Sequence, residues 1–268
     1  MLDSIKSGVT FQSIIRRMIK LLPETRNLVT QLENLSDRSI EFMRDDSLPV
    51  LASIKIARNG ASYHILQYKP SNNSLDYYIA QQVGIALRMY EQPENKRFDF
   101  ASDNSGEKDL EAIIKAAANL SSEDMQLLPM FTKSIYQWAL MQLRSIPIGM
   151  RVDAWLFESF PNMREAVRSG LAEQQQMNAG ILGRHIGGLM PPLNQFAPAA
   201  AYALFTDRLL GTSYVIPFKA AGSSGDGKLL LDIFDQIDSS SAYDVQLVNA
   251  WAKHLGMENW YQWIPYQP

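Results

Sequence analysis

The feature that most limits the fold is a single Asn59-Gly60 pair between two β-rich segments. The segments read PVLASIKIA and ASYHILQYK, and Arg58 precedes the pair. An Asn-Gly pair favours a tight hairpin turn, because both central residues of that turn need a positive φ angle. The pattern therefore predicts two antiparallel strands, at about residues 50–57 and 61–68.

Most of the remaining chain has the apolar spacing of helices. Residues 3–46 are predicted to be helical with a break at Pro23, and residues 94–108 are predicted to form a mobile loop with few apolar anchors. Pro147 and other prolines are expected between helices, where they are tolerated. The later helices are predicted at residues 75–90, 109–119, 122–144, 150–159, 161–183, 195–211, 226–237 and 243–256. The fold class is therefore α+β and predominantly α-helical, with one short antiparallel sheet, the hairpin at about 50–68, packed on a helical body.

The length of 268 residues corresponds to between one and two domains. We divide the chain into an N-terminal helical segment (1–48), a core with the hairpin and the helix that follows it (49–160), and a C-terminal helical region (161–268). We expect these three parts to form one compact unit, since a chain this long buries a core without disulfides.

Charge and composition exclude several classes of protein. The net charge of −3 gives no overall basic excess for nucleic acid. Cysteine is absent, so there is no disulfide, thiolate zinc site or cysteine nucleophile. The N-terminus lacks the pattern of a signal peptide, and no apolar run is long enough to span a membrane, so we expect a cytoplasmic protein. Arg16, Arg17 and Lys20 lie beside an apolar stripe, which is typical of a surface helix and also of a helix that rests on a membrane.

The helix predicted after the hairpin contains the most informative motif. Its residues 79–88 read Ile-Ala-Gln-Gln-Val-Gly-Ile-Ala-Leu-Arg. This segment resembles the zincin metallopeptidase helix in its frequent form Ile-Ala-His-Glu-x-Gly-His-Ala-Leu-Arg. Gln81 stands at the first zinc-binding His, Gln82 at the Glu that polarises the attacking water, and Ile85 at the second His. The flanking residues match, whereas the residues that carry the chemistry do not.

A second, weaker match lies farther along the chain. Residues 151–156, Arg-Val-Asp-Ala-Trp-Leu, resemble the segment Arg-Ile-Glu-x-Trp-Leu that supplies a third, carboxylate ligand in the gluzincin branch of the family. Asp153 would stand at that ligand position. The resemblance covers roughly residues 50–160 and implies that Gln81 and Ile85 project into a cleft under the hairpin, with Asp153 within reach.

The departures from the family motif remove its chemistry. A neutral Gln amide is a poor zinc ligand, Ile85 cannot bind a metal, and Gln82 cannot act as a general base. The resemblance therefore implies a pseudo-peptidase with no metal, no cofactor and no catalytic residue. The alternative is a plain amphipathic core helix, whose buried face is Leu75, Ile79, Val83, Ala86 and Tyr90. Gly84 would be an unexplained weak point in such a helix, whereas in zincin helices a small residue there permits close packing.

Other candidate sites carry weaker signals. The histidines His64, His185 and His254 are far apart in sequence and show no metal-ligand spacing. The glycine-rich stretch 222–227 lacks the Lys-Ser/Thr pair of a phosphate-binding loop. The C-terminal aromatic residues indicate either a segment docked on the body or a protein-contact surface: Trp251, Trp260, Tyr261, Trp263 and Tyr266.

The predicted function is that of a catalytically inactive metallopeptidase-like protein, which binds a protein partner or a peptide segment in a regulatory role. A peptide could add as a strand beside the hairpin, because strand addition needs backbone groups and no metal. The candidate groove residues are Ile54, Ile56, Tyr63, His64 and Tyr78. The alternatives are a helical subunit of a larger bacterial assembly and a hydrolase with an unrecognised active site. The sequence does not fix the oligomeric state.

Overall fold

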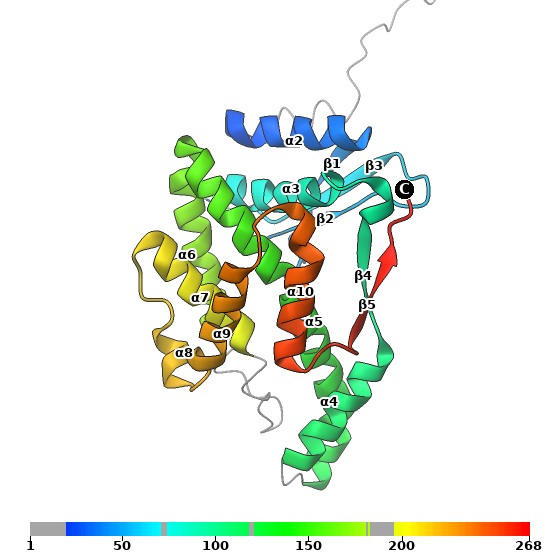
Figure 1. The fold of residues 1–268 in the computed structure, drawn as a ribbon, viewed down its shortest axis with the longest axis vertical. Coiled ribbons are helices and arrows are strands. Elements are labelled where there is room, and N and C mark those ends of the chain that lie inside the picture. The colour runs from blue at the N-terminus through cyan, green and yellow to red at the C-terminus, as the bar shows by residue number, and fades with distance from the viewer. Residues whose placement is uncertain (1–19, 71–73, 118–120, 181, 183–195) are drawn as a thin grey trace, which may run out of the picture.

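A computed structural model describes residues 20–70, 74–117, 121–180, 182 and 196–268. The predicted fold class is confirmed, because helices dominate and the strands form two small sheets (Figure 1). The helices are α2 (Pro23–Ser36), α3 (Leu75–Tyr90), α4 (Asn104–Ala117), α5 (Ser122–Ser159), α6 (Arg164–Gly180), α7 (Ala197–Leu210), α8 (Ile216–Ala220), α9 (Ser224–Gln236) and α10 (Asp244–Leu255). The strands are β1 (Ser39–Arg44), β2 (Ala52–Lys55), β3 (Tyr63–Tyr68), β4 (Phe98–Ser102) and β5 (Tyr261–Pro265).

The predicted hairpin is present. Strands β2 and β3 pair antiparallel, and Ile54 lies opposite Leu66. Asn59 and Gly60 have φ angles of 55° and 77°, the positive values that favour this residue pair at the turn. Both strands are shorter than predicted, because residues 56–62 form the connection between them.

The hairpin belongs to a mixed three-stranded sheet, which corrects the prediction of one purely antiparallel sheet. The strand order is β1-β3-β2, and β1 pairs parallel with β3. The prediction of helix over residues 3–46 is wrong at β1. Helix α2 ends at Asp37, whose φ angle is 54°. In the strand that follows, buried and more exposed side chains alternate, with Ile40 and Phe42 buried. This period-two burial is that of a strand with one covered face.

The loop predicted at residues 94–108 contains strand β4. Its partner β5 comes from the C-terminal end of the described chain and pairs with it antiparallel. Phe100 stacks on Tyr261 with ring centroids 4.5 Å apart and contacts Trp263 edge to face. The aromatic partners of Phe100 on β4 therefore come from residues about 160 positions later in the chain.

Helix α5 runs through Pro147 without a break, whereas two helices were predicted there. A proline inside a helix removes one backbone hydrogen bond, which costs about 3 kcal/mol. Burial of Ile146, Pro147 and Met150 in the folded protein offsets this loss. The other helices predicted after residue 160 agree with α6, α7, α9 and α10 to within a few residues, apart from the ends that lie outside the described residues.

The core joins all three parts of the predicted division. Helices α2 and α3 pack together over the three-stranded sheet, and α3 also contacts α5 and α6 (Figure 1). One hydrophobic cluster contains Leu32 from α2, Ile79 from α3, Leu143 from α5 and Trp251 from α10. Trp260, Tyr261 and Tyr266 are also buried, so most of the C-terminal aromatic residues dock on the body, as one of the two interpretations proposed.

Gly84 lies where α3 crosses α5. A Cβ atom at this position would lie 2.6 Å from Cγ1 of Val152 and 3.5 Å from the ring of Trp155. The glycine is therefore required by the close approach of the two helices, which explains the weak point noted in the sequence.

Replacing Gly84 by alanine is expected to destabilise the fold. Overpacking typically costs about 1–3 kcal/mol, which outweighs the gain of about 1 kcal/mol in helix propensity. The matched control is Gly225→Ala in α9, where no atom lies within 4 Å of the added Cβ. Urea unfolding should show a lower midpoint for Gly84→Ala and an unchanged or higher one for Gly225→Ala. Equal midpoints for the two variants would contradict the tight helix crossing.

Candidate functional site

The structure brings Gln81 and Asp153 together, as the sequence predicts. The Nε2 atom of Gln81 on α3 donates to Oδ1 of Asp153 on α5 over 2.9 Å. The two residues are 72 positions apart in the sequence. They do not lie in an open cleft, however, because Gln81 is only 5% exposed and Asp153 is fully buried. The site is a polar cluster inside the protein.

Two tyrosines complete the cluster around Asp153. Tyr77, one helical turn before Gln81, donates its hydroxyl to Oδ1 of Asp153 over 3.0 Å and accepts from Gln81 over 2.8 Å. Tyr202 on α7 donates to Oδ2 of Asp153 over 2.6 Å. Both hydroxyls also lie within hydrogen-bond distance of Oε1 of Gln174 on α6, at 3.1 and 2.9 Å. The cluster thus joins four helices, α3, α5, α6 and α7.

Burial controls the protonation of these groups. Desolvation raises the pKa of Asp153 to about 7, although the hydrogen bonds from Tyr202, Gln81 and Tyr77 act in the opposite direction. Burial also raises the pKa of both Tyr77 and Tyr202 well above the ordinary value, so both hydroxyls keep their protons. These three hydrogen-bond partners of Asp153 are all neutral, and a neutral partner cannot compensate a buried negative charge as a cation would.

The other two motif positions also have structural partners. Gln82 is half-buried, and its Oε1 accepts the backbone N–H of Ile54 on β2 over 3.2 Å. Ile85 packs against the hydrophobic core as a partly buried side chain. Among the residues that the structure describes, no group of three His, Cys, Asp or Glu side chains is placed to hold a metal ion.

The outer edge of β2 is partly closed by side chains. Gln82 occupies the N–H of Ile54, and Nη1 of Arg58 donates to the carbonyl of Ile56 over 2.9 Å. The N–H of Ile54 and the carbonyl of Ile56 both point away from β3. The backbone groups that pair with β3 belong to Leu51 and to every second residue after it, because the N–H of Lys69 donates to the carbonyl of Leu51. A peptide strand adding at this edge would first have to displace two side-chain hydrogen bonds.

The predicted groove residues do not share one surface. Tyr63 is exposed, whereas its neighbour His64 is fully buried on the opposite face of β3. Tyr78 is also buried, and its hydroxyl donates to the carbonyl of Gly170 over 3.1 Å. Ile54 and Ile56 are partly buried against the core.

His64 has a structural environment. Its Nδ1 accepts the backbone N–H of Ala57 over 2.9 Å, and its Nε2 lies 3.0 Å from Oγ of Ser36. Burial, with a smaller effect of Arg38, lowers the pKa of His64 to about 4. The ring is therefore neutral at pH 7 and fixes the turn of the hairpin against the end of α2. Of the other histidines, His254 lies 3.8 Å from Asp226, and His185 lies outside the described residues.

Sequence reasoning missed a second polar cluster beside the motif. Arg88 is the last residue of the first matched segment, and Arg151 is the first residue of the second. Both bind Asp244 at the start of α10. Arg88 makes two contacts of 2.8 Å to the carboxylate, and Nη1 of Arg151 makes one of 2.7 Å. Arg151 also donates to the carbonyls of Ile237 and Asp238. Tyr202 and Gln174 were missed as well, because nothing in the local sequence links α6 and α7 to the motif helix.

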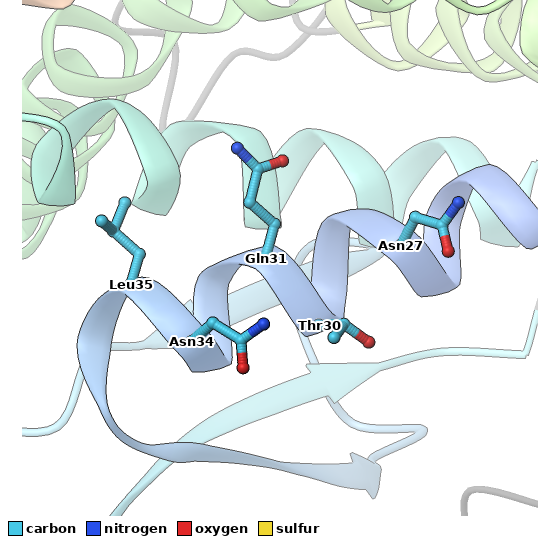
Figure 2. Close-up of a pocket in the computed structure, with 5 residues that line it drawn as sticks. All are labelled: Asn27, Thr30, Gln31, Asn34 and Leu35. Carbon is cyan, nitrogen blue, oxygen red and sulfur yellow. The ribbon is translucent and has the colours of Figure 1, made fainter.

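A shallow hollow lies away from this site, on the outer face of α2. Figure 2 shows its lining residues, which all come from that one helix: Asn27, Thr30, Gln31, Asn34 and Leu35. The hollow has no titratable side chain in its lining, so it offers no acid, base or metal ligand. The polar cluster at Asp153 remains the main candidate site.

Comparison with protein families, with curated proteins and with solved structures gave no match for this chain. None of the helices in the described ranges is long and apolar enough to cross a membrane.

Proposed function

We propose that this protein has a zincin-like scaffold without catalytic activity and that it acts as a protein-binding or regulatory component. The observation that carries the proposal is the hydrogen bond between Gln81 and Asp153. The resemblance implies that these two residues occupy ligand positions around one point, and they are in contact although 72 residues separate them. A plain amphipathic helix gives no reason for this pair to meet.

Hydrogen bonds replace the metal site in this proposal. Gln81 and Asp153 satisfy each other, and the hydroxyls of Tyr77 and Tyr202 fill the remaining positions around the carboxylate. Gln82 holds strand β2 by its amide oxygen and cannot serve as a base. The residues at the motif positions thus stabilise the fold and have lost the acid–base and metal chemistry of the family. We also propose a cytoplasmic location, since the lack of cysteine removes one reason to propose secretion.

Metal analysis of the purified protein tests the loss of the site. We expect far less than one zinc ion per chain, both as purified and after incubation with zinc followed by buffer exchange. Stoichiometric zinc that survives buffer exchange would overturn the proposal.

Restoration of the family motif tests the scaffold. The variant carries Gln81→His, Gln82→Glu and Ile85→His, which places two imidazoles one turn apart on α3 next to Asp153. We expect it to bind zinc with a Kd on the order of micromolar or lower, because the two His and the carboxylate supply three ligands. Little peptidase activity is expected, because the site is buried and lacks its supporting contacts. Calorimetric titration of zinc measures the affinity.

Two controls test whether zinc binding is specific to the restored site. Lys228→His with Asp232→His places the same pair one turn apart on the exposed face of α9. The restored variant should bind zinc at least about tenfold more tightly than this surface pair, and adding Asp153→Asn should weaken it about tenfold or more. If the folded variant binds no more tightly than the surface pair, the zincin-like scaffold is not supported. Circular dichroism establishes that the variant is folded.

A further inference from the structure

The turn of the β2–β3 hairpin carries two groups that can react with each other. In an Asn-Gly pair, the backbone nitrogen of the glycine can attack the side-chain carbonyl carbon of the asparagine, which is the first step of spontaneous deamidation. Glycine favours this step because it has no Cβ atom to hinder the approach. Asn59 and Gly60 are both exposed, so water and base reach the pair.

The reaction needs no partner other than water. The nitrogen of Gly60 gives its proton to base and forms a bond to Cγ of Asn59. The bond from Cγ to the amide nitrogen breaks, and ammonia leaves with a proton from water, which produces a cyclic imide. A water molecule then opens the imide at one of its two carbonyls, so the product is either aspartate or isoaspartate. Nothing is oxidised or reduced.

The conformation of the turn opposes this ring closure. Asn59 and Gly60 have φ angles of 55° and 77°, and the N–H of Ala61 donates to the carbonyl of Arg58 over 3.1 Å. These values define a type I′ turn. A cyclic imide fixes the ψ angle of the asparagine at a value that differs from the one in such a turn. The turn must therefore open before the ring can form.

Residues 266–268, which we call the closing segment, hold the turn in place. They lie beside the connection between β2 and β3 (Figure 1). The N–H of Asn59 donates to the carbonyl of Gln267 over 3.2 Å, and the N–H of Gly60 donates to the carbonyl of Pro268 over 3.1 Å. The second bond occupies the attacking nitrogen itself. The reaction thus requires the same local opening that controls amide hydrogen exchange.

Tyr266 fixes the closing segment to the body. Its side chain is buried, and its hydroxyl donates to the carbonyl of Ala57 over 2.6 Å and lies 2.7 Å from the hydroxyl of Tyr90. Its backbone N–H donates to the carbonyl of Arg97 over 3.0 Å, which continues the pairing of β5 with β4. The closing segment is therefore held at both of its ends, by the core and by the turn.

We propose that Asn59 is a deamidation site and that the closing segment controls how fast it reacts. Isoaspartate adds one carbon atom to the backbone, so the turn cannot keep its shape and the N–H groups of residues 59 and 60 lose their acceptors. The modification then releases the closing segment and does not reverse, because ammonia has left. The proposal involves no residue of the zincin-like motif and is independent of the proposed function.

Peptide mapping by mass spectrometry measures the reaction, with chromatography to separate isoaspartate from aspartate. The full chain is incubated in native buffer at pH 8 beside a synthetic peptide of residues 56–64. We expect Asn59 to react at least about tenfold more slowly in the folded chain than in the peptide. Deletion of Gln267 and Pro268 should speed the reaction in the chain by about threefold or more. Equal rates in chain and peptide, or an unchanged rate after the deletion, would overturn the proposal.

Two tyrosine variants separate local control from a general loss of stability. Tyr266→Phe keeps the buried ring and removes the hydroxyl that anchors the closing segment, so it should speed the reaction by about threefold or more. Tyr261→Phe is the same substitution on β5, where the hydroxyl donates to Asn249 over 2.7 Å and does not contact the turn. This control should react like the parent. Urea unfolding establishes that both variants are folded during the incubation. No acceleration by Tyr266→Phe, or equal acceleration by both variants, would overturn the proposal.

Discussion

Asp153→Asn is expected to remove a loss of stability that the buried carboxyl group imposes between pH 5 and pH 8. Burial raises the pKa of Asp153 from 3.8 to about 7, so in this interval the folded protein keeps a proton that the unfolded chain has lost. Stability from this group is fully present below pH 4, falls as the pH rises and is gone above pH 7. The loss between pH 5 and pH 8 is about 3 kcal/mol. An amide at position 153 cannot ionise, so the variant should not show this loss.

The measurement is the difference in unfolding free energy between parent and variant, determined by urea unfolding at several pH values. The comparison of parent with variant is needed because His64 also makes stability depend on pH. The pKa of His64 is lowered to about 4, so its contribution to the unfolding free energy changes with pH in the opposite direction to that of Asp153. The unfolded chain binds a proton at this histidine below pH 6.5 that the folded protein does not, so stability from His64 rises with pH. His64 is present in both proteins and cancels. A parent-minus-variant difference that stays constant from pH 5 to pH 8 would contradict the buried, uncompensated carboxylate.

Asp244→Ala is expected to destabilise the protein by about 3–5 kcal/mol, because it leaves two buried or half-buried guanidinium groups without their carboxylate. The side chain of Arg151 is only 2% exposed and that of Arg88 is 15% exposed. Arg151 retains its contacts to the carbonyls before α10, but its charge is no longer compensated. Thermal or urea unfolding measures the loss.

Asp235→Ala is the matched control. Asp235 also binds an arginine, Arg208, through two contacts of 2.7 and 3.0 Å, but both side chains of this pair are about half exposed. Exposed ion pairs contribute only about 0–1 kcal/mol, so the control should remain close to the parent. If the two alanine variants lose similar stability, the cluster of Arg88, Arg151 and Asp244 does not join α3 and α5 to α10 as described.

The sequence alone determined the elements whose signals are local. The Asn59-Gly60 pair marks the hairpin because its backbone requirement belongs to two adjacent residues. Helix α3 has the predicted bounds, 75–90, because its apolar spacing and the proline before it are both local. The contact between Gln81 and Asp153 was also predicted, through the resemblance of two short segments and not through periodicity. The resemblance itself remains a prediction that the zinc experiments test.

Only the tertiary structure decided the features whose partners are distant in sequence. Strand β4 lies in a mostly polar stretch of the chain and forms a strand because β5 pairs with it. Helix α5 continues through Pro147, and the proline is buried together with Ile146 and Met150 of the same helix. Arg88 meets Asp244 across 156 residues, and Tyr202 meets Asp153 across 49. Local patterns record the backbone preferences of neighbouring residues, whereas burial and hydrogen-bond partners are set by which distant segments pack together, and a single sequence does not record that choice.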